Sequence, residues 1–223
     1  MRKQLLLLCF LFIGSALTSQ AQKIEFGGGL GFMHYKGDIT PNLQLKSGRP
    51  AGNLFFRYNA SKALSGRFSA GAGRIYGSDF RSKDPFQLGR GYIFGTRMLE
   101  AGADLEYNFL DFDYTKRKPR NWSPYVFAGL AFYNFKPDQE PTESYRKSGL
   151  AIPFGLGIKW QIKGPWSLGF EFGTRKTWSD YLDGHNESGP AVERRLQTDP
   201  TRKDMYYYSS ISLSYTILRV FCP

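Results

Sequence analysis

Residues 97–110 read RMLEAGADLEYNFL, and two opposite kinds of side chain alternate along them. Leucine, alanine and aromatic residues occupy the odd positions from Leu99 to Phe109. The even positions hold Glu100, Gly102, Asp104, Glu106 and Asn108. Because successive side chains of a β-strand point to opposite faces, this stretch predicts a strand with one apolar face and one polar face.

Residues 166–184 read WSLGFEFGTRKTWSDYLDG and repeat the pattern. Leu168, Phe170 and Phe172 alternate with glycine and with Glu171, and Arg175 follows on the polar face. Two architectures accommodate such strands. A soluble β-sandwich buries the apolar face and exposes the charges, whereas a membrane barrel turns the apolar face to lipid and the charges inward.

The overall composition favours the membrane barrel. Aromatic residues make up 17% of the 223-residue chain and glycine occurs 25 times, yet the mean hydropathy is only −0.40. A helical membrane protein needs apolar runs of about 20 residues, whereas in a transmembrane strand only every second residue meets lipid.

The first residues have the features of an export signal. Residues 1–22 read MRKQLLLLCFLFIGSALTSQAQ, with a basic start, a short apolar run and small residues before Ala21. We therefore expect a signal peptide at residues 1–21 and an outer-membrane barrel domain at residues 22–223. The formal charge of +11 fits contact with lipopolysaccharide, anionic lipid or an acidic partner, and we expect no nucleic-acid partner because no such motif occurs.

The remaining chain shows the same alternation in eight segments and no helical period. These segments are residues 24–37, 51–60, 65–77, 97–110, 124–135, 150–162, 166–184 and 205–218. Long and short connections alternate between them, as extracellular loops and periplasmic turns do. The pattern predicts an all-β protein, an eight-stranded antiparallel transmembrane β-barrel. The third segment loses its alternation near Arg74, which indicates a bulge. The fifth segment sets Val126, Ala128, Leu130 and Phe132 on its apolar face, although its other face is also partly aromatic.

A lipid-facing Lys or Arg at the bilayer midplane costs about 2–4 kcal/mol, so we expect the charges to face the lumen and pair there. Such a lumen would be a plug rather than a wide pore. The expected lumen ion-pair residues are Glu25, Arg57, Glu100, Asp104, Glu106, Lys159, Glu171 and Arg175. Aromatic residues near the strand ends are expected to form interfacial girdles, namely Tyr107, Trp122, Trp160, Trp166, Trp178 and Tyr206–Tyr208.

One expected periplasmic turn is unusually long and basic. It covers residues 111–123, DFDYTKRKPRNWS, and carries Lys116, Arg117, Lys118 and Arg120. It is either a solvated loop near anionic headgroups or a docking element for a periplasmic partner, and its length favours docking.

No pattern in the sequence indicates a catalytic, cofactor or metal site. The glycine clusters at residues 27–32 and 71–77 lie within expected strands, whereas a phosphate-binding loop leads from a strand into a helix. His34 and His185 are far apart and Cys222 is the single cysteine after the leader, so neither a zinc site nor an internal disulfide is indicated. We expect a non-enzymatic protein without a small-molecule substrate.

Four stretches resemble a known family: Y-x-G-D at residues 35–38, SPYVFAGLAFYNFKP at 123–137, AIPFGLGIKW at 151–160 and GTRKTWSDYLDG at 173–184. They are similar to PorG, the outer-membrane β-barrel component of the type IX secretion system of Bacteroidetes. The similarity spans residues 24–218. The chain departs from the family at residues 183–184, where two acidic residues are expected, and at its end, where Phe221 is followed by Cys222 and Pro223.

The resemblance implies a barrel in outer-membrane lipid that tethers a periplasmic ring of the lipoprotein PorK and its partner PorN. The basic residues of 111–123 are then our hypothesis for the contact with that ring. The alternative is a stand-alone small barrel for adhesion, lipid binding or small-solute passage. A third possibility, an enzyme using lumen carboxylates, lacks a recognisable active site.

Overall fold

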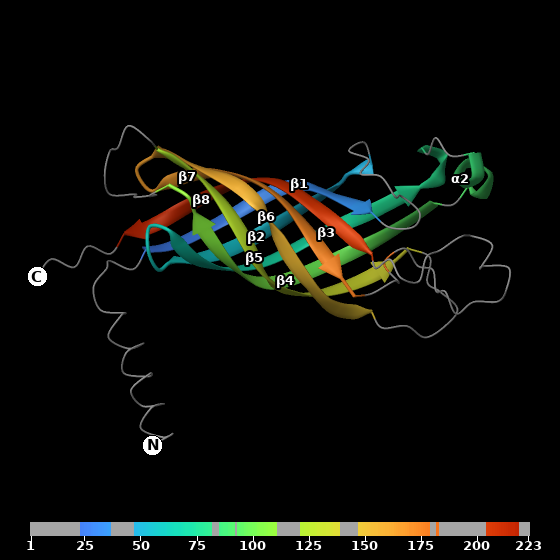
Figure 1. Cartoon of the computed structure of the whole chain (residues 1–223), viewed down its shortest axis with the longest axis horizontal. Coiled ribbons are helices and arrows are strands. Elements are labelled where there is room, and N and C mark those ends of the chain that lie inside the picture. Colours follow the sequence, from blue (N-terminus) through green and yellow to red (C-terminus); the bar gives the residue numbers. More distant parts are fainter. Residues whose placement is uncertain are drawn as a thin grey trace, which may run out of the picture.

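Eight antiparallel strands form a closed barrel in the computed structural model, and each strand pairs with its neighbour in the sequence (Figure 1). The structure describes residues 23–36, 47–81, 85–91, 93–110, 121–138, 147–178, 182 and 204–218. The strands are β1 (Lys23–Lys36), β2 (Arg49–Asn59), β3 (Leu64–Ser78), β4 (Ile93–Asn108), β5 (Trp122–Pro137), β6 (Ser148–Lys163), β7 (Trp166–Thr177) and β8 (Met205–Leu218). The expected fold class is confirmed, although β4 begins earlier and β7 ends earlier than the sequence pattern indicated.

Two short helices between β3 and β4 were not expected from the sequence. They are η2 (Asp79–Arg81) and α2 (Pro85–Arg90), and they extend beyond the barrel at one end (Figure 1). Among the described residues, no helix is long and apolar enough to cross a membrane.

The opposite end of the barrel carries the tight turns. Ser61 donates a backbone hydrogen bond of 3.0 Å to the carbonyl of Leu64, which closes the β2–β3 turn. Gly164 in the β6–β7 turn has a φ of +55°, a left-handed conformation that favours glycine. The start of β1 also lies here beside the end of β8, where Lys23 pairs with Leu218. In outer-membrane barrels the short turns are periplasmic, so we assign this end to the periplasm.

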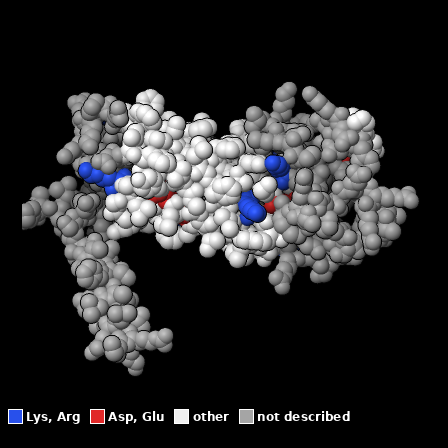
Figure 2. All heavy atoms as spheres, in the orientation of Figure 1, with Lys and Arg blue, Asp and Glu red and all other residues white. Residues whose placement is uncertain are grey.

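The barrel exterior is an apolar belt. Leu30 is 79% exposed and Leu54 is 72% exposed, although both lie in the middle of long strands. Lys and Arg are nearly absent from the middle of the visible wall (Figure 2). Large apolar side chains pointing outward from every strand are what a bilayer-spanning barrel requires. The belt includes Phe26, Phe68, Leu105, Leu130, Leu156, Phe170 and Ile211.

An aromatic girdle lies at the periplasmic end of this belt. Trp122 of β5 pairs with Trp160 of β6, and the rings of Trp166 and Tyr215 lie 5.1 Å apart. Tyr107 is also half exposed there, as expected.

The expectation for Tyr206 and Tyr208 was wrong. These side chains are 0% and 2% exposed because β8 turns its odd positions, such as Ile211, outward, so both tyrosines point into the barrel.

The expected bulge near Arg74 is also absent. The β3–β4 register runs without interruption from the pair of Leu64 and Tyr107 to the pair of Ser78 and Ile93. Arg74 points outward beyond the belt, and its neighbour Ile75 points into the barrel interior. The side chains therefore keep alternating between the two faces, but here the charged residue is outside and the apolar residue is inside. A register shift occurs instead in the β6–β7 ladder between Gln161 and Lys163.

Candidate functional site: the lumen network

Charged side chains from several strands meet inside the barrel. The residues that we call the lumen network are Glu25 (β1), Arg57 (β2), Arg67 (β3), Glu100, Asp104 and Glu106 (β4), Lys159 (β6), and Glu171 and Arg175 (β7). All eight residues expected from the sequence lie on the inner face, and Arg67 was missed. The sequence pattern could have predicted its inward position, because Arg67 directly precedes Phe68, which points outward and is 60% exposed.

The strand register places opposite charges beside each other. Glu25 pairs directly with Arg57 across the β1–β2 ladder, and Arg67 pairs with Asp104 across the β3–β4 ladder. The same register sets Arg57 directly opposite Arg67, which is unfavourable for two like charges. A carboxylate between the two guanidinium groups is therefore required, and Glu106 supplies it.

Glu106 is the acidic centre of the network and has no solvent-accessible surface. Its carboxylate lies 2.8 Å from Nε of Arg57, 3.2 Å from Nε of Arg67 and 2.5 Å from Nζ of Lys159. These cations come from β2, β3 and β6, so one carboxylate connects strands across the lumen.

Arg67 is the basic centre. Its Nη2 lies 2.9 Å from Oδ2 of Asp104, its Nε contacts Glu106, and its Nη1 forms an ion pair with Glu171. The guanidinium carbon also lies 4.9 Å from the centre of the Phe127 ring, within cation–π range. Arg67 thus joins carboxylates of β4 and β7 that lie on different sides of the barrel.

Because glycine has no side chain, Gly157 leaves room for a further contact, between Tyr125 and Glu171. Tyr125 of β5, Gly157 of β6 and Glu171 of β7 are consecutive partners across two ladders. The Tyr125 ring crosses over Gly157, and its hydroxyl donates a 2.9 Å hydrogen bond to Glu171. A Cβ at Gly157 would lie 2.6 Å from that hydroxyl oxygen, so any larger residue would displace the ring.

The network continues toward the extracellular end through Glu100. Nε of Arg175 lies 3.5 Å from Glu100, and the Tyr206 hydroxyl donates a hydrogen bond to the same carboxylate. Beyond this point apolar side chains pack together in the interior, with buried polar side chains such as Thr96 and Asp204 among them. The buried apolar layer includes Met33, Ile75, Phe94, Met98, Tyr133, Phe135 and Leu182.

Leu182, which follows β7 in the chain, is held within this layer by its backbone. Its carbonyl accepts a 2.8 Å hydrogen bond from the Thr96 hydroxyl, and its N–H donates one of 3.2 Å to Asp204. Asp204 also accepts a 2.5 Å hydrogen bond from the Tyr35 hydroxyl. The extracellular half of the lumen is therefore closed by packed side chains.

The arrangement is suited to structure rather than catalysis. Each network carboxylate lies against a cation, and all of them except Glu100 are buried, so the buried ones are not accessible to an entering substrate as general bases. Within the described ranges, no group of three or more His, Cys, Asp or Glu side chains is arranged to hold a metal ion.

Two sequence-based expectations lie outside the described residues. They are the signal peptide at residues 1–21 and the basic residues Lys116, Arg117, Lys118 and Arg120.

Solved structures of outer-membrane barrels share this fold. Neisserial surface protein A has a TM-score of 0.52 at 9% identity, covering 88% of this chain and 97% of that one. Ail, the attachment invasion locus protein of Yersinia pestis, has a TM-score of 0.51 at 11% identity, with coverage of 89% and 100%. A major outer membrane protein from Thermus thermophilus has a TM-score of 0.50 at 12% identity, also with coverage of 89% and 100%.

Identities this low establish similarity of fold alone. No curated protein matches the chain at a significant level. One family model, described as a domain of unknown function, DUF6089, matches residues 3–223. Because this match spans nearly the whole chain, the protein belongs to the DUF6089 family.

Proposed function

We propose that this protein is a non-enzymatic anchor in the outer membrane that acts through its surfaces rather than through its lumen. The observation that carries the proposal is the filled interior. Glu106, Tyr133 and Tyr206 come from three different strands, and none has solvent-accessible surface. An interior packed in this way supports neither solute passage nor a buried active site, so the two rims and the outer wall are the surfaces left for function.

The more specific proposal is that the anchor serves type IX secretion, where it would tether the periplasmic ring of PorK and PorN. Its support is the resemblance to PorG over residues 24–218. The location of the β4–β5 connection adds to it. The N–H of Phe109 donates a 3.0 Å hydrogen bond to the carbonyl of Pro124, and the Ser123 hydroxyl bonds Leu110. The end of β4 and the start of β5 therefore lie at the periplasmic end, the side from which a periplasmic ring would approach.

Affinity purification from the native membrane tests this role. The tagged wild-type chain should retain PorK and PorN, and replacement of Lys116, Arg117, Lys118 and Arg120 together by Ser should weaken that retention. A control with the same loss of charge at the opposite rim replaces Arg97, Lys136, Lys147 and Lys176 by Ser, and it should retain the ring. Elution of a folded wild-type barrel without either ring protein would refute the secretion role.

The alternative role in adhesion has one observation in its favour. Phe80 and Leu88, within the two short helices at the extracellular end, are 61% and 45% exposed. If adhesion were the function, replacing both by Ser would reduce attachment of cells to a surface or host matrix without changing the amount of folded barrel. Unchanged attachment would remove this support.

A further inference from the structure

A band of basic side chains lies on the barrel exterior, just beyond the apolar belt at the extracellular end. Arg74 of β3 pairs directly with Arg97 of β4, and Arg97 pairs with Lys136 of β5. All three are exposed, and Figure 2 shows Lys and Arg side chains on the wall toward this end. Like charges directly opposite each other are destabilising, so a bound anion would add to the compensation that Asp138 gives Arg74.

The surface around Arg74 is hollowed. Arg74 forms an ion pair with Asp138, and the guanidinium carbon of Arg49 lies 4.1 Å from the centre of the Tyr76 ring. Gly95 lies beneath the ion pair, where a Cβ would come within 3.0 Å of Nη2 of Arg74. These residues border a hollow of about 530 Å³, which is large enough for a sugar or phosphate group.

The height of the band matches the headgroups of the outer leaflet. Arg97 and the girdle residue Tyr107 both point outward from β4 and are ten positions apart. At a rise of about 3.3 Å per residue they are separated by about 33 Å along the strand. A strand tilt of about 40° converts this into roughly 25 Å along the membrane normal, which is the usual height of the apolar band.

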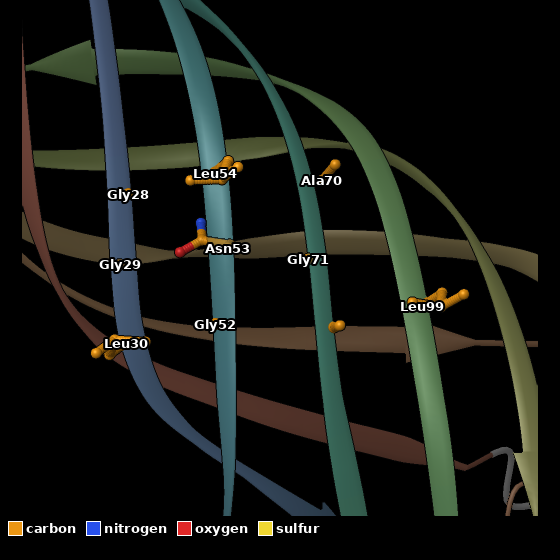
Figure 3. Close-up of a pocket in the computed structure, with 10 residues that line it drawn as sticks. Gly28, Gly29, Leu30, Gly52, Asn53, Leu54, Ala70, Gly71 and Leu99 are labelled. Atoms are coloured by element: carbon orange, nitrogen blue, oxygen red, sulfur yellow. The ribbon is translucent and has the colours of Figure 1, made fainter.

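A shallow apolar depression lies directly below the basic band. It measures about 570 Å³ and opens on the outer face of β1 to β4. Small residues, among them Gly28, Gly52 and Ala70, line it together with Leu30, Leu54 and Leu99 (Figure 3). Ala72, which also lines it, pairs with Leu99 two residues below the pair of Arg74 and Arg97. The depression and the band therefore overlap on strands β3 and β4.

We propose that this face binds a phosphorylated glycolipid of the outer leaflet. Its phosphate groups contact Arg74, Arg97 and Lys136, and an acyl chain lies in the depression below. Guanidinium groups bind phosphate oxygens through paired, charge-assisted hydrogen bonds, and Lys adds a point charge. The sugar backbone of such a lipid fits the hollow beside Arg74. This inference depends on the barrel and its orientation and is independent of the proposed ring partner.

The test measures binding of lipid A to the mature full-length chain in detergent, by native mass spectrometry with dephosphorylated lipid A as the comparison ligand. The charge variant is Arg97→Gln with Lys136→Gln, which leaves the ion pair of Arg74 intact. The control is Lys62→Gln with Lys163→Gln, which removes the same charge at the exposed periplasmic turns. Ala72→Phe fills the depression. Heat-dependent gel migration verifies that every variant is folded.

We expect the charge variant to bind lipid A about 10- to 30-fold more weakly, because each basic residue near an anionic surface contributes about a factor of five. The control should bind as the wild type does, and dephosphorylated lipid A should bind weakly to all variants. Equal affinity of the charge variant and the wild type, an equal loss in the control, or equal binding of dephosphorylated lipid A would overturn the proposal. Unchanged affinity of Ala72→Phe would overturn the placement of the acyl chain.

Discussion

Replacing Arg67 by Leu should destabilise the barrel strongly, because three buried carboxylates depend on this guanidinium. Asp104, Glu106 and Glu171 all lie within ion-pair distance of it, and all are at most 6% exposed. Removing one partner of a buried ion pair costs about 3–5 kcal/mol, since the other charge is left without compensation. Glu106 keeps Arg57 and Lys159, so we expect a loss of this size rather than a multiple of it.

The free energy of unfolding can be measured by urea titration of the barrel in lipid vesicles. Trp122 and Trp160 lie on the exterior, so their fluorescence reports the loss of the lipid environment. Adding Asp104→Asn to Arg67→Leu should recover about 1–2 kcal/mol, because a neutral amide is less costly to bury than an uncompensated carboxylate.

The matched control is Arg97→Leu, the same substitution on the exterior near the headgroups. Charged residues at that height cost only about 0–1 kcal/mol, so the control should change stability by no more than that. A loss below about 1 kcal/mol for Arg67→Leu, equal to the control, would refute a dry lumen network and would mean that water solvates these carboxylates.

Three further predictions concern the hydroxyl of Tyr125, the lipid belt and the filled lumen. Tyr125→Phe removes a hydrogen bond to the charged Glu171, and urea titration should show a loss of about 1.5–3 kcal/mol, with no change arguing against this bond. Ala101→Arg, at the belt midplane, should cost about 2–4 kcal/mol in vesicles, whereas Tyr107→Arg at the interface should cost less, and equal costs would contradict the membrane position. The wild-type barrel in planar bilayers should give no steady ion conductance, and a stable open level would contradict the closed lumen.

Within the apolar belt, the alternation of side chains was sufficient to predict the strands and their faces. In β4 and β7 one face is apolar and the other is charged. To assign the apolar face to lipid and the charged face to the lumen, it was enough that lipid excludes charge. Even in β5, where both faces are aromatic, the expected orientation is confirmed: Val126 points outward, and Tyr125 and Tyr133 point inward.

The errors arose where the chemistry of the two faces changes along a strand. Beyond the apolar belt basic side chains such as Arg74 point outward, and aromatic side chains such as Tyr206 point into the interior. A pattern read as apolar outside and polar inside fails there, although the alternation itself continues. Arg67 was missed for a different reason. The prediction for residues 65–77 rested on their apolar residues alone, so the inward position of Arg67 beside the outward Phe68 was not considered.

The sequence by itself determined that the charges lying within the apolar belt would gather in the lumen, because local alternation and the cost of charge in lipid exclude them from the outer face there. Which charges pair was decided only by the tertiary structure. Arg67 and Glu171 are 104 positions apart and meet because the barrel has closed with one particular register and diameter. That geometry depends on all eight ladders together, so no single strand encodes the contact.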